Sequence, residues 1–242
     1  MMESSVILKH YGRLYNPTNW GYYPHYLTNR FYYICSGNVV YKNKITLKPG
    51  YIYLFSADEE FQVVQSQDDP IDHIYFDFIS SHSFIDKELI EINPDDYPRL
   101  KNVINALTMD YTLSDLPADV AESYLNIILY ELREYFVQNR IYCDLTTDIF
   151  RLIHESKASE LTVAGIADTL NVNVNHMIRT FKKDTGITPL KYIGLMKSEL
   201  AISYARKGET LEDIAEKLGY STVSALSVAF KNVTNKNLSQ FR

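Results

Sequence analysis

The sequence has few of the residues on which metal centres and disulfide frameworks depend. Its 242 residues include two cysteines, Cys35 and Cys143, and six histidines that form no HxH pair. This scarcity argues against structural zinc, against disulfides and against the histidine-ligated metal sites of barrel enzymes. We therefore expect no metal, no cofactor and no enzymatic activity, with both cysteines present as free, buried thiols.

Long hydrophobic runs are also missing. The first 16 residues contain no continuous apolar segment of signal-peptide length, and the most apolar stretch, residues 124–132, is interrupted by Asn126 and Glu131. Apolar residues make up 46% of the chain and charged residues 22%, which is typical of globular proteins. We expect a soluble, cytoplasmic protein with no membrane partner.

The chain as a whole lacks the excess of positive charge that is typical of proteins that bind nucleic acid. Its net charge is −6, but the charge is unevenly distributed. Residues 1–157 carry 13 Lys and Arg against 22 Asp and Glu, whereas residues 158–242 carry 11 against 8. Because an acidic region repels phosphate and a basic one attracts it, only the C-terminal part is a candidate for a nucleic-acid partner.

Short aromatic and β-branched runs, separated by turn residues, predict strands in the first 80 residues. The six runs are RFYYIC, NVVYKN, KITLKPG, YIYLFSA, EFQVVQSQ and HIYFDFIS. Six strands at this spacing are typical of a sandwich or barrel. From Ser81 to Gln138 apolar residues recur every three or four positions, which predicts helices, the second of them with Pro117 at its first position. After a break at residues 139–144, the pattern is helical to the end of the chain.

Aromatic residues concentrate in the same N-terminal region, where 17 of the 32 lie within the first 80 positions. Aromatic rings fill the cores of small barrels, and they also line pockets that bind flat ligands. Both interpretations stay open, and in the second of them the barrel binds a small molecule. The candidate ligand-binding residues are then Trp20, Tyr22, His25, Arg30, Tyr32 and Tyr75.

The C-terminal region contains a repeat. The heptamers TFKKDTG at 180–186 and AFKNVTN at 229–235 lie 49 residues apart, inside a longer match between residues 161–186 and 209–235. Each copy predicts a Thr N-cap, a short helix, a turn and a second helix that begins at a polar cap, and Asn173 and Ser221 are the expected second caps. This is the pattern of a helix-turn-helix unit, and the sequence contains two copies of it.

One long helix is predicted between the two units. TPLKYIGLMKSELAISYARKG has a capping Thr188, Pro189 at the first helical position and Gly208 past the end. A helix of about 19 residues is about 28 Å long. Such a strut would hold two recognition helices about one DNA turn apart, since successive major grooves on one face of a duplex are separated by about 34 Å.

The C-terminal region resembles the DNA-binding domain of AraC-type transcriptional regulators, over about residues 145–242. The residues that carry the resemblance are LEDIAEKLGYS at 211–221, the following AFK, and LSQFR at the end of the chain. The resemblance implies two helix-turn-helix units joined by a long helix, preceded by a cupin-like β-barrel that senses a small molecule and by helices that form a dimer. The expected fold is multidomain, with a barrel in 1–80, a helical connector in 81–140 and an all-α DNA-binding domain in 145–242.

The resemblance also implies which side chains meet double-stranded DNA, because the second helix of each unit lies in the major groove. In the first unit these residues are Asn173, Val174, Asn175, His176, Ile178, Arg179, Lys182 and Lys183. In the second unit they are Ser221, Thr222, Val223, Ser224, Ser227 and Lys231. The lysine pair of the first unit has a less favoured alternative, a solvated helix end that complements the helix dipole, and His176 is equally compatible with a capping or packing role.

The second unit departs from the family pattern. Val228 occupies the position that matches Arg179, Leu195 and Lys197 stand where the family often has arginines, and NKN at 235–237 replaces a glycine-containing turn. We therefore expect the first unit to carry most of the sequence specificity and the second to position the protein. The alternative function is a protein-interaction module of the same fold with weak or no DNA binding.

A homodimer is the expected assembly, because the helix predicted at 117–138 has an apolar stripe. The stripe either forms the dimer contact or is buried on the barrel. Its residues are Val120, Tyr124, Ile127, Ile128, Leu132 and Tyr135.

Overall fold

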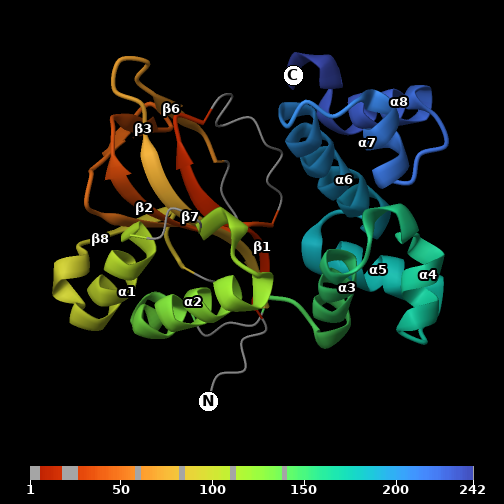
Figure 1. Ribbon diagram of the computed structural model, residues 1–242. Helices are drawn as coiled ribbons and strands as arrows, with labels where there is room; N and C mark the ends of the chain where they lie inside the picture. The colour runs from red at the N-terminus through yellow and green to blue at the C-terminus, as the bar shows by residue number, and fades with distance from the viewer. Residues whose placement is uncertain are drawn as a thin grey trace. The chain divides into compact units, whose positions relative to one another are not determined.

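The computed structural model describes residues 6–17, 27–57, 61–81, 85–109, 113–137 and 141–241. The chain divides into two compact units, Met1–Ile141 and Tyr142–Arg242, here called unit 1 and unit 2 (Figure 1). Within the described ranges, unit 1 combines strands with two α-helices, and unit 2 is helical. The predicted class, with an N-terminal sheet domain and a C-terminal helical domain, is confirmed.

The described strands of unit 1 form two antiparallel sheets. The larger has the order β1-β7-β2-β5-β8 and the smaller the order β4-β3-β6. The strands of the larger sheet are β1 (Val6–Tyr15), β7 (Asp72–Ser80), β2 (Asn29–Ser36), β5 (Ile52–Phe55) and β8 (Leu89–Ile92). Those of the smaller sheet are β4 (Ile45–Leu47), β3 (Val39–Tyr41) and β6 (Val63–Gln65).

Strand alternation gives the larger sheet two apolar faces. Along β2, Phe31 belongs to one buried cluster while Tyr32 and Ile34 belong to another. The second cluster also contains Val39 and Val63 of the smaller sheet, so the two sheets face one another across it. Because successive side chains of a strand point to opposite faces, the first cluster must be covered from the other side. The helices of unit 1 provide that cover.

Helices α1 (Pro98–Met109) and α2 (Ala118–Glu131) cover the outer face of the larger sheet (Figure 1). Short 3-10 turns η1 (Pro94–Asp96), η2 (Leu113–Asp115) and η3 (Arg133–Tyr135) flank them. Pro117 is the N-cap of α2 rather than its first helical residue. Ile128 and Leu132 are fully buried in the cluster, whereas Val120 and Ile127 are exposed. The predicted stripe is therefore divided between the sheet and the surface.

Two strands lie outside the six predicted runs. β1 pairs with β7 from Val6 to Tyr15, and β8 pairs with β5 beyond residue 80. The charged and glycine residues of β1, including Lys9 and Gly12, interrupt the apolar pattern by which strands are detected. The larger sheet thus extends past the boundary predicted at residue 80.

Both cysteines are free thiols, but the prediction that both are buried was wrong. Cys143 is exposed and Cys35 is half-buried. Cys143 is the N-cap of a helix, and its Sγ lies 3.5 Å from the hydroxyl oxygen of Thr146.

Unit 2 consists of α3 (Asp144–Glu155), η4 (Ala158–Glu160), α4 (Val163–Thr169), α5 (Val174–Thr185), α6 (Pro189–Arg206), α7 (Leu211–Lys217), α8 (Val223–Thr234) and η5 (Leu238–Phe241). Figure 1 shows α6 running between the α4–α5 pair and the α7–α8 pair. The core joins Phe150, Phe181 and Tyr192 from α3, α5 and α6, with ring centroids 5.0 to 5.9 Å apart. None of the helices in the described ranges is long and apolar enough to cross a membrane.

Candidate nucleic-acid interface

The first helix-turn-helix unit is built from α4 and α5 by local hydrogen bonds. Thr162 caps α4 by accepting from the Gly165 amide at 3.0 Å. The turn then passes through Asn171, which has a left-handed φ of 52°. Asn173 caps α5, since its Oδ1 accepts from the amides of Asn175 at 3.0 Å and His176 at 3.2 Å. These caps satisfy amides that the helices themselves leave open, and they fix where each helix begins.

The second unit repeats this construction in α7 and α8. Thr210 accepts from the Asp213 amide at 3.1 Å, and its hydroxyl donates to the Asp213 carboxylate at 2.6 Å. Gly219 occupies the left-handed turn position with a φ of 76°. The cap of α8 is Thr222, whose hydroxyl accepts from the Ala225 amide at 3.1 Å, and not the predicted Ser221. Ser221 is the additional residue of the longer second turn.

The two second helices present equivalent faces at an offset of 49 residues. Each buries one side, α5 with Met177 and Phe181 and α8 with Leu226 and Phe230. Positions separated by three and four residues share a helix face, so the opposite side of each helix forms one surface. On α5 this surface consists of Asn175, Ile178, Arg179 and Lys182, and on α8 of Ser224, Ser227, Val228 and Lys231. All are exposed except Ile178, which is half-buried.

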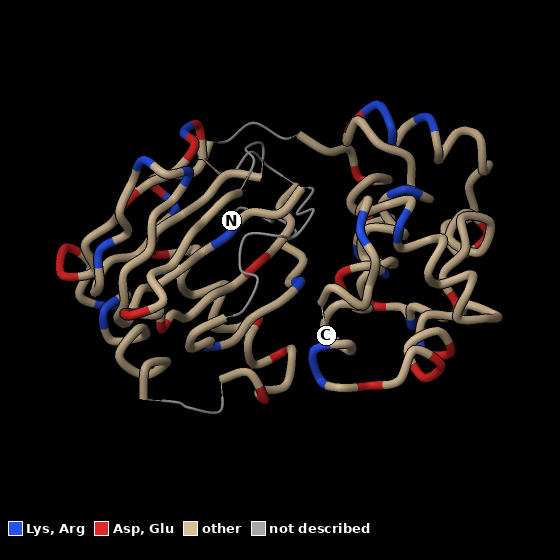
Figure 2. The backbone as a smooth tube through the Cα atoms, turned by 90° about the horizontal axis from the view of Figure 1, so that it is seen from above, with Lys and Arg blue, Asp and Glu red and all other residues tan. Residues whose placement is uncertain are grey.

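The remaining predicted DNA contacts lie at the margins of these faces. His176 and Lys183 are exposed, about 90° around α5 from the face of Asn175 and Arg179. Val174 and Val223, the first residues of their helices, are half-buried. The side-chain oxygens of Asn173 and Thr222 are already engaged as caps. Figure 2 shows both basic and acidic positions in unit 2, and the positive excess of residues 158–242 is modest, 11 Lys and Arg against 8 Asp and Glu.

Helix α6 is the central support of both units. Its 18 residues begin at Pro189 behind the Thr188 cap, as predicted, and Gly208 follows its end with a φ of 81°. Leu195 is buried, and Lys197 donates from Nζ to the Leu218 carbonyl at 2.9 Å, with its ammonium 5.4 Å from the Tyr220 ring centroid. Burial lowers the pKa of Lys197. Lys197 therefore holds the C-terminus of α7, a role that its sequence position did not reveal.

The turn of the second unit contacts the segment that precedes the first. A Cβ placed on Gly219 would lie 2.6 Å from the Ser159 carbonyl oxygen and 2.7 Å from its Cα. Ser159 belongs to η4, directly before α4, so this backbone approach links the two helix-turn-helix units. Only a residue without a side chain permits such an approach.

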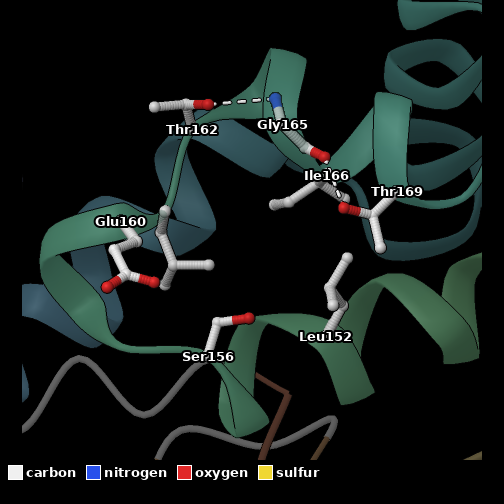
Figure 3. A pocket seen from close by; sticks show the side chains of 8 residues that line it. Leu152, Ser156, Glu160, Thr162, Gly165, Ile166 and Thr169 are labelled. Carbon is white, nitrogen blue, oxygen red and sulfur yellow. Dashed lines mark hydrogen bonds between the residues drawn. The ribbon is translucent and has the colours of Figure 1, made fainter.

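A pocket of about 180 Å³ lies among α3, η4 and α4 (Figure 3). Its wall includes Leu152, Ile166 and the carboxylate of Glu160. The Thr162 hydroxyl accepts from the Gly165 amide, and the Thr169 hydroxyl donates to the Gly165 carbonyl at 2.9 Å. Both hydroxyls are thus used within α4, and Glu160 is the charged group of the wall.

Three of the six candidate ligand-binding residues of unit 1 come together. Arg30, Tyr32 and Tyr75 lie on the face of the larger sheet that meets the smaller one, and the rings of Tyr32 and Tyr75 are 6.3 Å apart. Arg30 is fully buried. Trp20, Tyr22 and His25 lie outside the described residues.

Arg30 lies close to a carboxylate, a backbone carbonyl and an aromatic ring. Its Nε is 3.6 Å from Asp77 Oδ1, its Nη1 donates to the Thr28 carbonyl at 3.2 Å, and its guanidinium lies 4.4 Å from the Phe61 ring centroid. Among the described residues, Nε and Nη2 have no hydrogen-bond partner. Since buried donors are normally satisfied, this guanidinium has unused capacity to bind an acceptor.

The C-terminal part of the chain is similar in sequence to known proteins. Residues 166–242 match the family described as "Helix-turn-helix domain". A protein described as an AraC-like transcription regulator from Streptomyces lividans is 43% identical over 82 residues, which is 34% of this chain and 27% of the relative. One from Streptomyces antibioticus is 36% identical over 91 residues, which is 37% of this chain and 30% of the relative. The chain thus spans less than a third of the length of either relative.

Similarity in fold covers both units of the chain. The crystal structure of ToxT from Vibrio cholerae with a bound unsaturated fatty acid has a TM-score of 0.54 at 16% identity, covering 99% of this chain and 95% of ToxT. A likeness at this identity concerns the fold. Together with the sequence match in residues 166–242, it shows that the chain carries a helix-turn-helix domain after an N-terminal sheet domain.

Proposed function

We propose that unit 2 binds double-stranded DNA sequence-specifically, with α5 and α8 in successive major grooves, and that the chain is a transcriptional regulator. One observation carries this proposal: the same capped helix-turn-helix is built twice on one central helix, and both second helices expose the equivalent face. Helix α6 is about 27 Å long, which suits a groove repeat of about 34 Å.

The two helices have different chemical means of reading DNA. Arg179 and Asn175 on α5 carry the groups that pair with guanine and adenine edges, and Lys182 supplies a charge for phosphate. The equivalent positions of α8 are Val228, Ser224 and Lys231. Helix α5 therefore carries most of the hydrogen-bonding specificity.

The proposal is tested by selecting bound duplexes from random DNA and titrating the enriched site by fluorescence anisotropy over a salt series. We expect Arg179→Ala to weaken binding to the selected site by about 1–3 kcal/mol and to relax the preference at one base pair, because a bidentate contact is lost. Arg151→Ala is the matched control, since Arg151 is ion-paired with Asp148 on α3. It should leave both affinity and preference unchanged.

Two outcomes would change this assignment. If Arg179→Ala leaves the site preference intact while Ser224→Ala abolishes it, α8 is the principal reading helix. If no sequence is enriched and affinity does not fall steeply with salt, the chain is a protein-interaction module, because groove binding releases counterions.

We further propose that the two sheets of unit 1 form a cupin-like barrel and that a small molecule bound there controls this activity. The support is the buried Arg30 guanidinium beside Tyr32 and Tyr75, in which Nε and Nη2 have no hydrogen-bond partner within the described ranges, although Nε lies 3.6 Å from Asp77 Oδ1. A carboxylate is the acceptor that fits a guanidinium best. ToxT, which shares the fold, has been crystallised with an unsaturated fatty acid.

Binding of oleate to the whole chain, measured by calorimetry, tests this control. Wild type should bind, Arg30→Met should bind at least tenfold more weakly, and oleate should change the DNA affinity of wild type alone. Lys101→Met, an exposed change on α1, is the control. Equal oleate binding by wild type and Arg30→Met would remove Arg30 from the site.

A further inference from the structure

The exposed face of α8 contains an apolar side chain at its centre. Val228 is 57% exposed, and it lies between Ser224 and Lys231, four residues before it and three after. Its counterpart on α5 is Arg179. The remaining position on this face is Ser227, so the central part of the surface consists of one isopropyl group and two hydroxyls.

This composition is selective in a different way from that of α5. An isopropyl group cannot pair with the guanine O6 and N7 acceptors, and pressed against them it would displace their water without replacing the hydrogen bonds. The thymine C5-methyl is the apolar group of the major groove, and apolar side chains contact it. Serine hydroxyls accept or donate, and so they tolerate either edge of an A·T pair.

From this geometry, and on the basis of the proposed DNA binding, we propose that α8 reads thymine methyl groups, with Val228 as the specificity-determining residue. The half-site under α8 is then A·T-rich, with thymine opposite Val228. Lys231, one turn further along the same face, holds the adjacent phosphate. The two halves of the binding site therefore differ in kind, one read by hydrogen bonds and the other by apolar contact.

Deoxyuridine isolates this contact, because it keeps every hydrogen-bonding group of thymine and lacks only the methyl. The selected duplex is prepared in three forms: unmodified, with deoxyuridine throughout the α8 half-site, and with deoxyuridine throughout the α5 half-site. The α5 half-site is the one in which Arg179→Ala changes the base preference. Anisotropy titrations then compare wild type, Val228→Ala and Ser239→Ala, the last being an exposed position outside both faces.

For wild type we expect the α8-half substitution to weaken binding about fourfold per contacted methyl, the worth of one buried methyl group. Val228→Ala should lose most of this sensitivity, and Ser239→Ala should keep it. The inference is overturned if deoxyuridine in the α8 half-site has no effect, or if wild type and Val228→Ala respond equally. Either result leaves DNA binding itself intact, whereas the absence of an enriched site would instead contradict the proposed function.

Discussion

At the scale of single residues, the difference between the two reading helices comes from side chains that play no part in folding. Arg179 and Val228 occupy equivalent exposed positions, while the residues that fix the helices, Met177 and Leu226, are buried. Because exposed positions of a helix contribute little to its stability, they are free to differ between the units. The exposed side chains of the two helices can therefore differ without altering the buried residues that hold each helix in place.

His73 makes the stability of unit 1 depend on pH. Its ring is buried 4.9 Å from Tyr32 and 5.6 Å from Tyr75, and burial lowers its pKa from 6.5 to about 4, although a hydrogen bond with the Leu14 backbone acts in the opposite direction. In the unfolded chain His73 therefore takes up a proton near pH 6.5, whereas in the folded chain it stays neutral until the pH approaches 4. His73 therefore leaves the free energy of unfolding unchanged above pH 6.5 and lowers it as the pH drops toward 4.

We expect wild type to lose about 2 kcal/mol more unfolding free energy than His73→Phe between pH 7.5 and pH 5. Urea unfolding followed by the fluorescence of Trp20, the only tryptophan, measures this difference in unit 1. Parallel pH profiles for the two proteins would show that His73 is not the group that is protonated on unfolding.

At the scale of elements, the second turn is fixed by a backbone contact and not only by its own sequence. Gly219 has a left-handed φ of 76°, and Ser159 fills the space into which a Cβ would project. Gly186 has nearly the same φ, 77°, but nothing lies within 4 Å of its Cβ position among the described atoms. Both glycines thus adopt a left-handed φ, but only Gly219 also lies where a Cβ would collide with a neighbouring segment.

Alanine substitution separates these requirements. Gly186→Ala should cost about 1–2 kcal/mol through left-handed strain alone. Gly219→Ala should cost about 1–3 kcal/mol more, since η4 has to move away from the turn. Urea unfolding followed by the helical circular dichroism of unit 2 gives both values. Equal costs would mean that the contact with Ser159 does not constrain the two helix-turn-helix units.

At the scale of the whole molecule, we propose that the exposed part of α2 forms a homodimer contact. Val120, Ile127 and Tyr130 are 38%, 47% and 58% exposed, and their spacing places them on one side of the helix. A dimer presents four helix-turn-helix units to DNA, so each needs fewer phosphate contacts, which suits the modest positive charge of unit 2.

Sedimentation at micromolar concentration tests this assembly. Wild type should sediment as a dimer and Ile127→Glu as a monomer, because a charge would be buried in an apolar contact. Asn102→Glu, which adds the same charge to the exposed side of α1, should remain dimeric. A wild-type chain that stays monomeric would rule out this contact.

The sequence by itself determined the features that depend on neighbouring residues. The caps at Thr162, Asn173, Thr188 and Thr210, the left-handed turns and the extent of α6 follow from local hydrogen bonds and backbone preferences, and all are observed. The repeat made the helix-turn-helix assignment specific, since two copies at a fixed offset constrain each other.

Tertiary structure decided the features that depend on distant partners. The pairing of β1 with β7, the burial of Ile128 but not Ile127, and the bond from Lys197 to Leu218 join residues whose proximity no local pattern encodes. The choice of Thr222 over Ser221 as the cap also depends on where the longer turn lets α8 begin. Local periodicity identifies which residues can share a face, whereas packing decides what that face meets.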